Sequence, residues 1–340
     1  MVRPLTGLGN THLRSGQAQL AAAVFVGAVH ITHVNEGPHN AAQIELLESL
    51  AEARLQLGDS EGAKGARDTV DALLQRHYGD DKLALVEPLM RQADWLHRAG
   101  FILEERETYR DIVQIIRSEK GRKDLSLVEP LLKLGATYLY IDSTGAQPLS
   151  GTATPTGEVY FKRAIRIIES NPDASWEISA NAMVAFGDFY TIRSDFNRAQ
   201  SSYMDAWQLL SEDPSRETRR DELLGQPHPL TRVSVRRYYG GDELPFDIEA
   251  EDNLLDGTVT ATYAINDHGR VNNLAITEIA PHEFTEMGRH VERELRQQVF
   301  RPVLDQSGPV HAPSQLFEHQ FFYTRAEWES LRARHQRTEN

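Results

Sequence analysis

The chain has no cysteine among its 340 residues. That absence excludes disulfide bridges, thiolate zinc sites, iron–sulfur clusters and thiol nucleophiles together. Long hydrophobic runs are also missing, since the longest one, residues 20–29, is too short to cross a bilayer. Its place after Arg3 and Arg14 is typical of a signal-peptide core. We favour a second interpretation, in which these residues belong to the second helix of a structural repeat.

The chain has fewer basic than acidic residues. The chain has 36 Lys and Arg against 50 Asp and Glu, a net charge of −14, and the deficit is shared equally by residues 1–212 and 213–340. An evenly acidic protein repels phosphate backbones, so we expect no nucleic-acid partner. The hydrophobic content of 40% is ordinary for a folded protein, and the length allows two domains.

Recognisable catalytic motifs are absent as well. The sequence contains no phosphate-binding loop of the Walker type, no nucleophile elbow and no HExxH pair. Gly7 and Gly9 form a fragment of a dinucleotide fingerprint, but no strand precedes them and the repeat register explains both glycines. We therefore predict no catalytic residues, no cofactor and no enzymatic activity.

Two groups of residues suggest a metal only weakly. His30 and His33 lie three residues apart on a predicted helix with His39 beyond, a zinc-like spacing that no carboxylate completes. Acidic residues crowd positions 242–252, but their spacing fits no calcium-binding loop. The sequence predicts surface histidines, a solvated acidic loop and no metal.

What the sequence does have is a repeat. A pair of residues, usually Leu-Gly, returns in steps of 42, 42, 42 and 52 residues, and the same order of small and bulky residues follows each pair. A period of this length predicts stacked helical hairpins. The five pairs are Leu8-Gly9, Leu50-Ala51, Gln92-Ala93, Leu134-Gly135 and Phe186-Gly187.

A second marker has the same period: Gly37, Gly79 and Gly121 lie in polar stretches that lead into the next first helix. Together these patterns resemble the tetratricopeptide repeat in its long, kinesin-light-chain-like form. The resemblance implies an all-α solenoid of five units over residues 1–212. A Gly-, Pro-, Ser- and Thr-rich loop insertion at 142–155 enlarges the fourth unit.

Solenoids of this family bind partners along the concave face formed by their first helices. The steps of 42 residues from Glu45 and Glu52 make an acidic ladder that favours a basic peptide. The alternative is a solvated face, because acidic residues are common at helix starts. By analogy, the predicted partner-binding residues on this face are Arg3, Asn10, Arg14, Glu45, Glu52, Gln56, Glu87, Asp94, Arg98, Glu129, Tyr140 and Asp188.

The pattern changes after the repeats. Residues 213–229 are polar and read as a linker, and residues 258–265 then alternate as a half-buried strand. A turn at Asn266 to Gly269, a second strand, a helix at 284–299 and a strand at 316–323 follow. The tail, 326–340, is predicted to begin as a short helix.

This β–β–α–β order over 230–325, with Gly257-x-Val259, Gly269-x-Val271 and Phe300-Arg301-Pro302, resembles the carboxy-terminal domain of TonB. The resemblance implies a sheet edge that pairs with a strand of a partner; our candidates are Leu316, Glu318, Gln320 and Phe322, and residues 232–239 are a further candidate edge strand. Energy transducers of that family also carry a membrane anchor and a Pro-rich spacer, and neither occurs in these 340 residues.

The two resemblances together favour a non-enzymatic interaction adaptor or scaffold of the bacterial envelope, placed in the periplasm by an export signal outside this sequence. Its expected partner is a protein or peptide, basic in the groove or an outer-membrane protein at the sheet edge. Two alternatives stay open: an accessory component of TonB-dependent transport, and an enzyme with a site between the domains.

Overall fold

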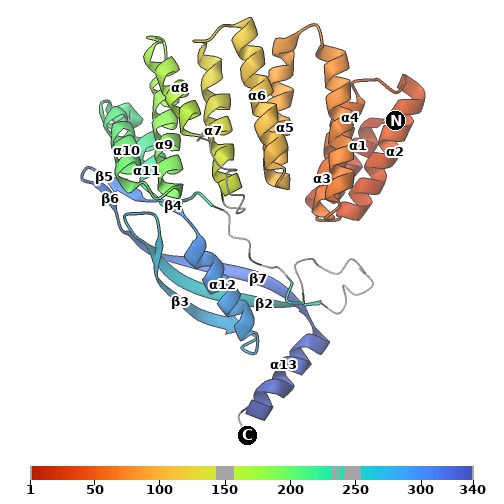
Figure 1. Cartoon of the computed structure of the whole chain (residues 1–340). Coiled ribbons are helices and arrows are strands. Elements are labelled where there is room, and N and C mark those ends of the chain that lie inside the picture. The colour runs from red at the N-terminus through yellow and green to blue at the C-terminus, as the bar shows by residue number, and fades with distance from the viewer. Residues whose placement is uncertain (1, 143–156, 232–234, 236–237, 241–253, 339–340) are drawn as a thin grey trace, which may run out of the picture. The chain divides into compact units, whose positions relative to one another are not determined.

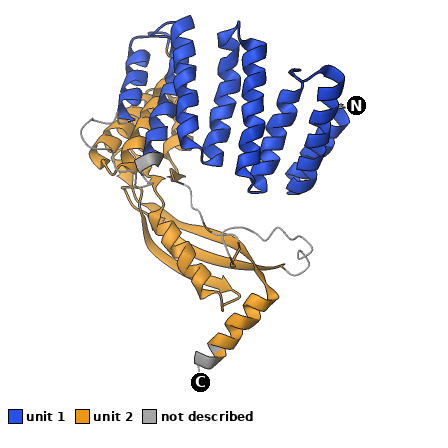
Figure 2. Ribbon diagram, turned by 45° about the vertical axis from the view of Figure 1, so that its right-hand side comes forward, with its two compact units in different colours: residues 1–173 blue, residues 174–340 orange. Residues whose placement is uncertain are grey.

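The computed structural model describes residues 2–142, 157–231, 235, 238–240 and 254–338. The predicted insertion at 142–155 therefore falls, apart from the backbone of its first residue, outside the described residues. The chain divides into two compact units, Met1–Asp173 and Ala174–Asn340 (Figure 2). The division falls within the predicted repeat array rather than at its end.

Paired antiparallel helices make up the first unit (Figure 1). A short 3-10 turn precedes α5 at Lys82–Leu85 and another precedes α7 at Leu125–Leu127. The helices are α1 (Val2–Arg14), α2 (Ala18–Glu36), α3 (Gln43–Gln56), α4 (Ser60–Tyr78), α5 (Val86–Ala99), α6 (Ile102–Glu119), α7 (Val128–Asp142) and α8 (Glu158–Glu169). The predicted helical hairpins are confirmed.

The first and fourth hairpins close where a glycine of the first helix meets an aromatic residue of the second. A Cβ added to Gly9 would lie 2.6 Å from the Phe25 ring, and one added to Gly135 would lie 2.6 Å from the Phe161 ring. The periodic glycine thus lets the helices of one hairpin approach closely.

The turns inside the hairpins also follow the period. Gly16, Gly58 and Gly100 end their first helices with φ of 75°, 76° and 83°. A left-handed residue at this position lets its N–H and the next reach back to the last helical carbonyls, and glycine adopts it without steric strain.

Helix α2 contains the longest apolar run. Ala21, Phe25 and Ala28 are fully buried in the hairpin, while Leu20 and Val26 are half exposed. By length and composition the whole helix, Ala18–Glu36, could cross a membrane. The apolar run at 20–29, which alone was counted in the sequence analysis, is too short to do so. The buried face of α2 packs like those of the other second helices, as the repeat register predicted.

The second unit begins with a fifth hairpin, α9 (Trp176–Ile192) and α10 (Phe196–Ser211). The segment predicted as a linker, 213–229, follows this hairpin and contains a 3-10 turn, Pro214–Arg216, and a helix, α11 (Glu217–Leu224). Leu224 is fully buried.

An antiparallel sheet of order β3-β2-β7 makes up the rest of this unit, formed by β2 (Leu254–Ile265), β3 (Val271–Ala280) and β7 (Ala312–Thr324). Helix α12 (Thr285–Gln297) covers one face (Figure 1). Shorter elements are β1 (His228–Pro229), β4 (Phe300–Arg301), β5 (Val303–Asp305), β6 (Gly308–Val310) and the terminal helix α13 (Arg325–Thr338).

The alternation predicted for β2 is present, because Val259, Ala261, Tyr263 and Ile265 are buried against α12. A helical repeat region followed by a small α+β region with antiparallel sheets is thus confirmed.

Candidate functional site

The residues predicted to line the groove lie on the first helices of the hairpins. Glu45 is on α3, Glu87 on α5 and Glu129 on α7, and all three are exposed. Arg3 and Arg14 are exposed on α1. Asn10 is half-buried on α1 and Gln56 is exposed on α3; Tyr140 belongs to α7, but its side chain lies outside the described residues.

Ion pairs connect consecutive first helices. The Arg98 guanidinium on α5 donates to both carboxylate oxygens of Glu52 on α3, at 3.0 and 2.9 Å. Lys133 on α7 lies 3.6 Å from the carboxylate of Asp94 on α5. Since each pair joins one first helix to the next, α3, α5 and α7 share one polar face within the first unit.

These pairs change the acidic ladder. Glu52 and Asp94 already have cationic partners, and Glu87 pairs with Arg91 one turn along its own helix at 3.2 Å. No ion pair or hydrogen bond of the Glu45 or Glu129 side chain occurs within the described residues. A cationic ligand therefore meets unpaired carboxylates at these two positions and must compete for the others.

Asp94 also accepts a hydrogen bond from the Tyr109 hydroxyl of α6, at 3.3 Å. Burial raises the pKa of Tyr109, and the Asp94 carboxylate raises it further, so the phenol is a permanent donor. The tyrosine thereby fixes the carboxylate on the first-helix face.

Asp188, predicted as a groove residue, has a different environment. It occupies in α9 the repeat position of Asp94, and the Tyr203 hydroxyl donates to it at 2.8 Å. The Arg301 guanidinium binds the same carboxylate in bidentate fashion, with Nε 2.8 Å from Oδ1 and Nη2 2.6 Å from Oδ2. Asp188 is therefore an internal anchor between the fifth hairpin and strand β4 of the second unit.

Arg301 has a role that the sequence alone does not predict. Its Nη1 also donates to the Leu223 carbonyl at the end of α11, at 2.8 Å, and the whole residue is buried. In the sequence the Phe300-Arg301-Pro302 motif carries part of the TonB resemblance, and no anchoring role is predicted for Arg301. A basic residue next to a Phe of the predicted core could have indicated a buried cation, but nothing in the sequence identifies its carboxylate partner.

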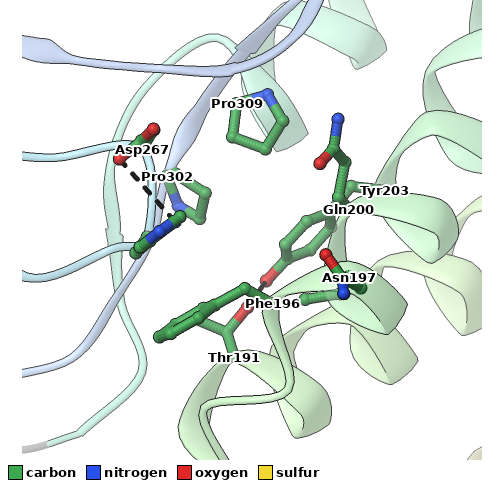
Figure 3. Close-up of a pocket in the computed structure, with 10 residues that line it drawn as sticks. Thr191, Phe196, Asn197, Gln200, Tyr203, Asp267, Pro302 and Pro309 are labelled. Carbon is green, nitrogen blue, oxygen red and sulfur yellow. Dashed lines mark hydrogen bonds and ion pairs between the residues drawn. The ribbon is translucent and has the colours of Figure 1, made fainter.

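Next to this anchor the β2–β3 turn meets the α9–α10 turn. The His268 ring stacks on Phe196 with centroids 4.2 Å apart, and Arg270 donates to the Ser194 hydroxyl at 2.8 Å. An open pocket of about 600 Å³ lies here (Figure 3), lined by Thr191, Phe196, Asn197, Ala199, Gln200, Tyr203, Asp267, His268, Pro302 and Pro309. The predicted alternative of an enzyme would place its site at this junction.

The predicted sheet edge lies on β7. Leu316, Glu318 and Gln320 have exposed side chains, while Phe322 is half-buried. The Phe322 carbonyl accepts a hydrogen bond from the Tyr239 N–H at 2.9 Å, on the side of β7 away from β2. Because backbone groups alternate sides, those of Leu316, Glu318 and Gln320 face the same outer edge.

Tyr238 forms a parallel bridge with Phe322, so the predicted strand at 232–239 does reach the end of this edge; positions 232–234 and 236–237 lie outside the described residues. The other edge, β3, is less regular. Its pairing with β2 shifts register twice, and Asn273 has a φ of 49°. Bulges of this kind protect an edge against strand addition, whereas β7 pairs in continuous register from Gln315 to Thr324.

The histidines considered for zinc lie elsewhere. His30 and His33 border an apolar groove of about 900 Å³ together with Val26 and Leu50. Across the described ranges no three His, Asp or Glu side chains are grouped as metal ligands.

Comparison with known proteins gives no family: no protein-family model matches the sequence, and no curated protein matches it. Among solved structures, a Q17M form of nearly identical TPR-like repeats, described as from a kinesin light chain of Podosopora anserina, is 14% identical with a TM-score of 0.47, covering 64% of this chain and 96% of that chain. BtubC from P. vanneervenii is 12% identical with a TM-score of 0.42, covering 61% and 79%.

Proposed function

We propose that the protein is a non-enzymatic interaction adaptor that binds a protein or peptide segment along the first-helix face of α3, α5 and α7. The observation that carries the proposal is the pair of ion bridges Arg98–Glu52 and Lys133–Asp94. They place side chains from successive repeats within one salt-bridge length of each other. A face built this way offers a regular row of polar groups to an extended ligand.

The ligand that suits this face is basic. Glu45 and Glu129 are exposed carboxylates without a cationic partner in the described residues, and they lie on α3 and α7, the first and last helices of this face. A segment with spaced Lys or Arg side chains satisfies the outer carboxylates directly. This choice rests on charge complementarity.

The test uses fluorescence anisotropy of a labelled hexalysine peptide with the full chain. The double variant Glu45→Gln/Glu129→Gln should weaken binding about tenfold, while Glu61→Gln, an exposed carboxylate on α4, should leave it unchanged. Changing Glu52 or Asp94 to Lys is a poorer test, because the new cation would face Arg98 or Lys133. Equal affinities of the two variants for the peptide would exclude the first-helix face as its binding site.

A second binding mode is supported by the regular outer edge of β7. A partner strand would form main-chain hydrogen bonds with Leu316, Glu318 and Gln320. The TonB-like sequence features favour a partner in the bacterial envelope, an accessory role in TonB-dependent transport and a periplasmic location. Titration with amino-terminal peptides of outer-membrane receptors tests this mode, and unchanged amide resonances of β7 would exclude it.

A further inference from the structure

Four arginines gather at one end of the first unit. Arg117 is in the last turn of α6, Arg122 is in the following turn, and Arg163 and Arg166 are on α8. Within the described residues none of them forms an ion pair; the one hydrogen bond is from Arg166 Nε to the Lys162 carbonyl of its own helix, at 3.2 Å.

The structure holds these like charges close together. Asn171, just after α8, donates to the Lys123 carbonyl at 2.8 Å and to the Ile167 carbonyl at 2.7 Å, which fixes the α6–α7 turn against the end of α8. Arg163 is half-buried. Its burial lowers its pKa, and the neighbouring Arg117, Arg122 and Arg166 lower it further. The free protein therefore holds an unfavourable concentration of positive charge.

The repeats themselves show that the fold does not need a cation at two of these four positions. One period earlier, Arg122 and Lys123 correspond to Asp80 and Asp81. Arg163 corresponds to Asp111 in the third hairpin. The same hairpin architecture thus forms with the opposite charge at these positions, so packing does not explain Arg122 or Arg163.

We propose that Arg117, Arg122, Arg163 and Arg166 bind an acidic segment of a partner protein, on a surface separate from the first-helix groove. The planar guanidinium group presents paired N–H donors that match a carboxylate. Several such groups converging, with no ion-pair partner among the described residues, are suited to a short run of Asp or Glu side chains. Binding would relieve the repulsion among the arginines.

The surroundings favour a short acidic segment over a long polyanion or a membrane. Exposed Glu119 follows Arg117 on α6, and exposed Glu169 follows Arg166 on α8, so carboxylates bound the cluster on both helices. The chain as a whole carries −14. A nucleic acid or an anionic bilayer extends beyond the roughly 10 Å over which salt leaves the local charge unscreened, and it would meet net repulsion there.

The experiment measures anisotropy of a labelled hexaglutamate peptide with the full chain at low ionic strength. The double variant Arg163→Gln/Arg166→Gln should weaken binding at least about tenfold. The matched control Arg76→Gln removes an exposed arginine of α4 that has no ion pair within the described part of the chain, and it should bind as the unaltered protein does. These variants leave the groove carboxylates intact, so hexalysine binding should persist.

A thermal unfolding scan of the same variants separates binding from structure. Removing mutual repulsion should leave the midpoint of the double variant unchanged or higher; a lower midpoint would assign the arginines a structural role and overturn the proposal. No peptide binding, equal binding by the double variant, or displacement of the peptide by duplex DNA or by phosphatidylserine vesicles at equal anionic charge would also overturn it.

Discussion

Asp94 in the first unit and Asp188 in the second occupy the same repeat position, and each accepts a hydrogen bond from a tyrosine 15 residues later. Their other partners differ. Lys133 approaches Asp94 at 3.6 Å, with side chains 49% and 59% exposed, whereas Arg301 binds Asp188 at 2.6 Å, with side chains 10% and 18% exposed. One position of the repeat thus serves an open polar face in one unit and a buried anchor in the other.

The difference shows how a repeat can be joined to an unrelated fold. The fifth hairpin keeps the glycine and tyrosine of the pattern, Gly187 and Tyr203, so its internal packing is unchanged. Only the solvent-facing acid acquires a new partner, Arg301, from the α+β part of the same unit. The α+β part of the second unit thereby holds the fifth hairpin, and the hairpin keeps its repeat geometry.

Removing the anchor should have the largest effect. Arg301→Met leaves the Asp188 carboxylate buried beside an apolar side chain, and we expect a loss of about 3–5 kcal/mol in the free energy of unfolding. Lys133→Met, the equivalent change beside exposed Asp94, should lose less than about 1 kcal/mol. Urea unfolding with hydrogen exchange of α9 and β4 measures both, and similar losses would refute the comparison.

The turns give the next largest contrast. Gly269 has a φ of 71°, and an added Cβ would lie 1.9 Å from the Phe300 carbonyl oxygen, so Gly269→Ala should destabilise the second unit by about 2–3 kcal/mol. Gly100 has a φ of 83°, but nothing lies within 4 Å of its Cβ position. Gly100→Ala should therefore lose only about 1 kcal/mol, from backbone strain alone. Thermal unfolding of the two variants tests the order.

The sequence predicts those parts of the fold in which the contacting residues are close together in the chain. The 42-residue period located the hairpins because Gly9 and Phe25 are close in sequence and meet within one unit. Alternation located β2 for the same reason. The anchor could not be found this way, because Asp188 and Arg301 are 113 residues apart and only tertiary structure joins them.

Helix α11 shows a second kind of failure. Five of its eight residues are charged, and it buries Leu224 alone, so no apolar periodicity reveals it. Ion pairs such as Arg220 with Glu217 at 2.9 Å stabilise the helix, and Arg220 also lies over the Trp207 ring of α10. These contacts use polar side chains, and a polar composition is what led to the prediction of a linker at 213–229.

The third prediction concerns pH and the first unit. Burial raises the pKa of Asp71 on α4 to about 6, from 3.8 for a free side chain. The folded state therefore favours the protonated acid, and its contribution to stability is complete below about pH 4 and lost as the pH rises through 6. Allowing for partial exposure, we expect a loss on the order of 2 kcal/mol over that range.

Asp71→Asn should abolish this pH dependence and stabilise the protein at neutral pH. The Gln92 amide already donates to Asp71, while the Gln92 Oε1 atom is buried without a hydrogen-bond partner in the described residues. An Asn amide at position 71 can accept from Gln92 and donate back to it. Urea unfolding at pH 4 and pH 7 measures the effect, and an unchanged pH profile in the variant would assign the dependence to another group.

The smallest expected effect is the coupling energy of an ion pair on the first-helix face, compared with that of the anchor. A double-mutant cycle on Glu52 and Arg98, whose side chains are 27% and 49% exposed, should give a coupling energy of about 0.2–1 kcal/mol that disappears in molar salt. A cycle on Asp188 and Arg301 should retain most of its coupling there, because protein rather than salt solution surrounds that pair. A groove pair that stays coupled at high salt would mean that the first-helix face is held as rigidly as the anchor, so a ligand could not displace Arg98 to reach Glu52.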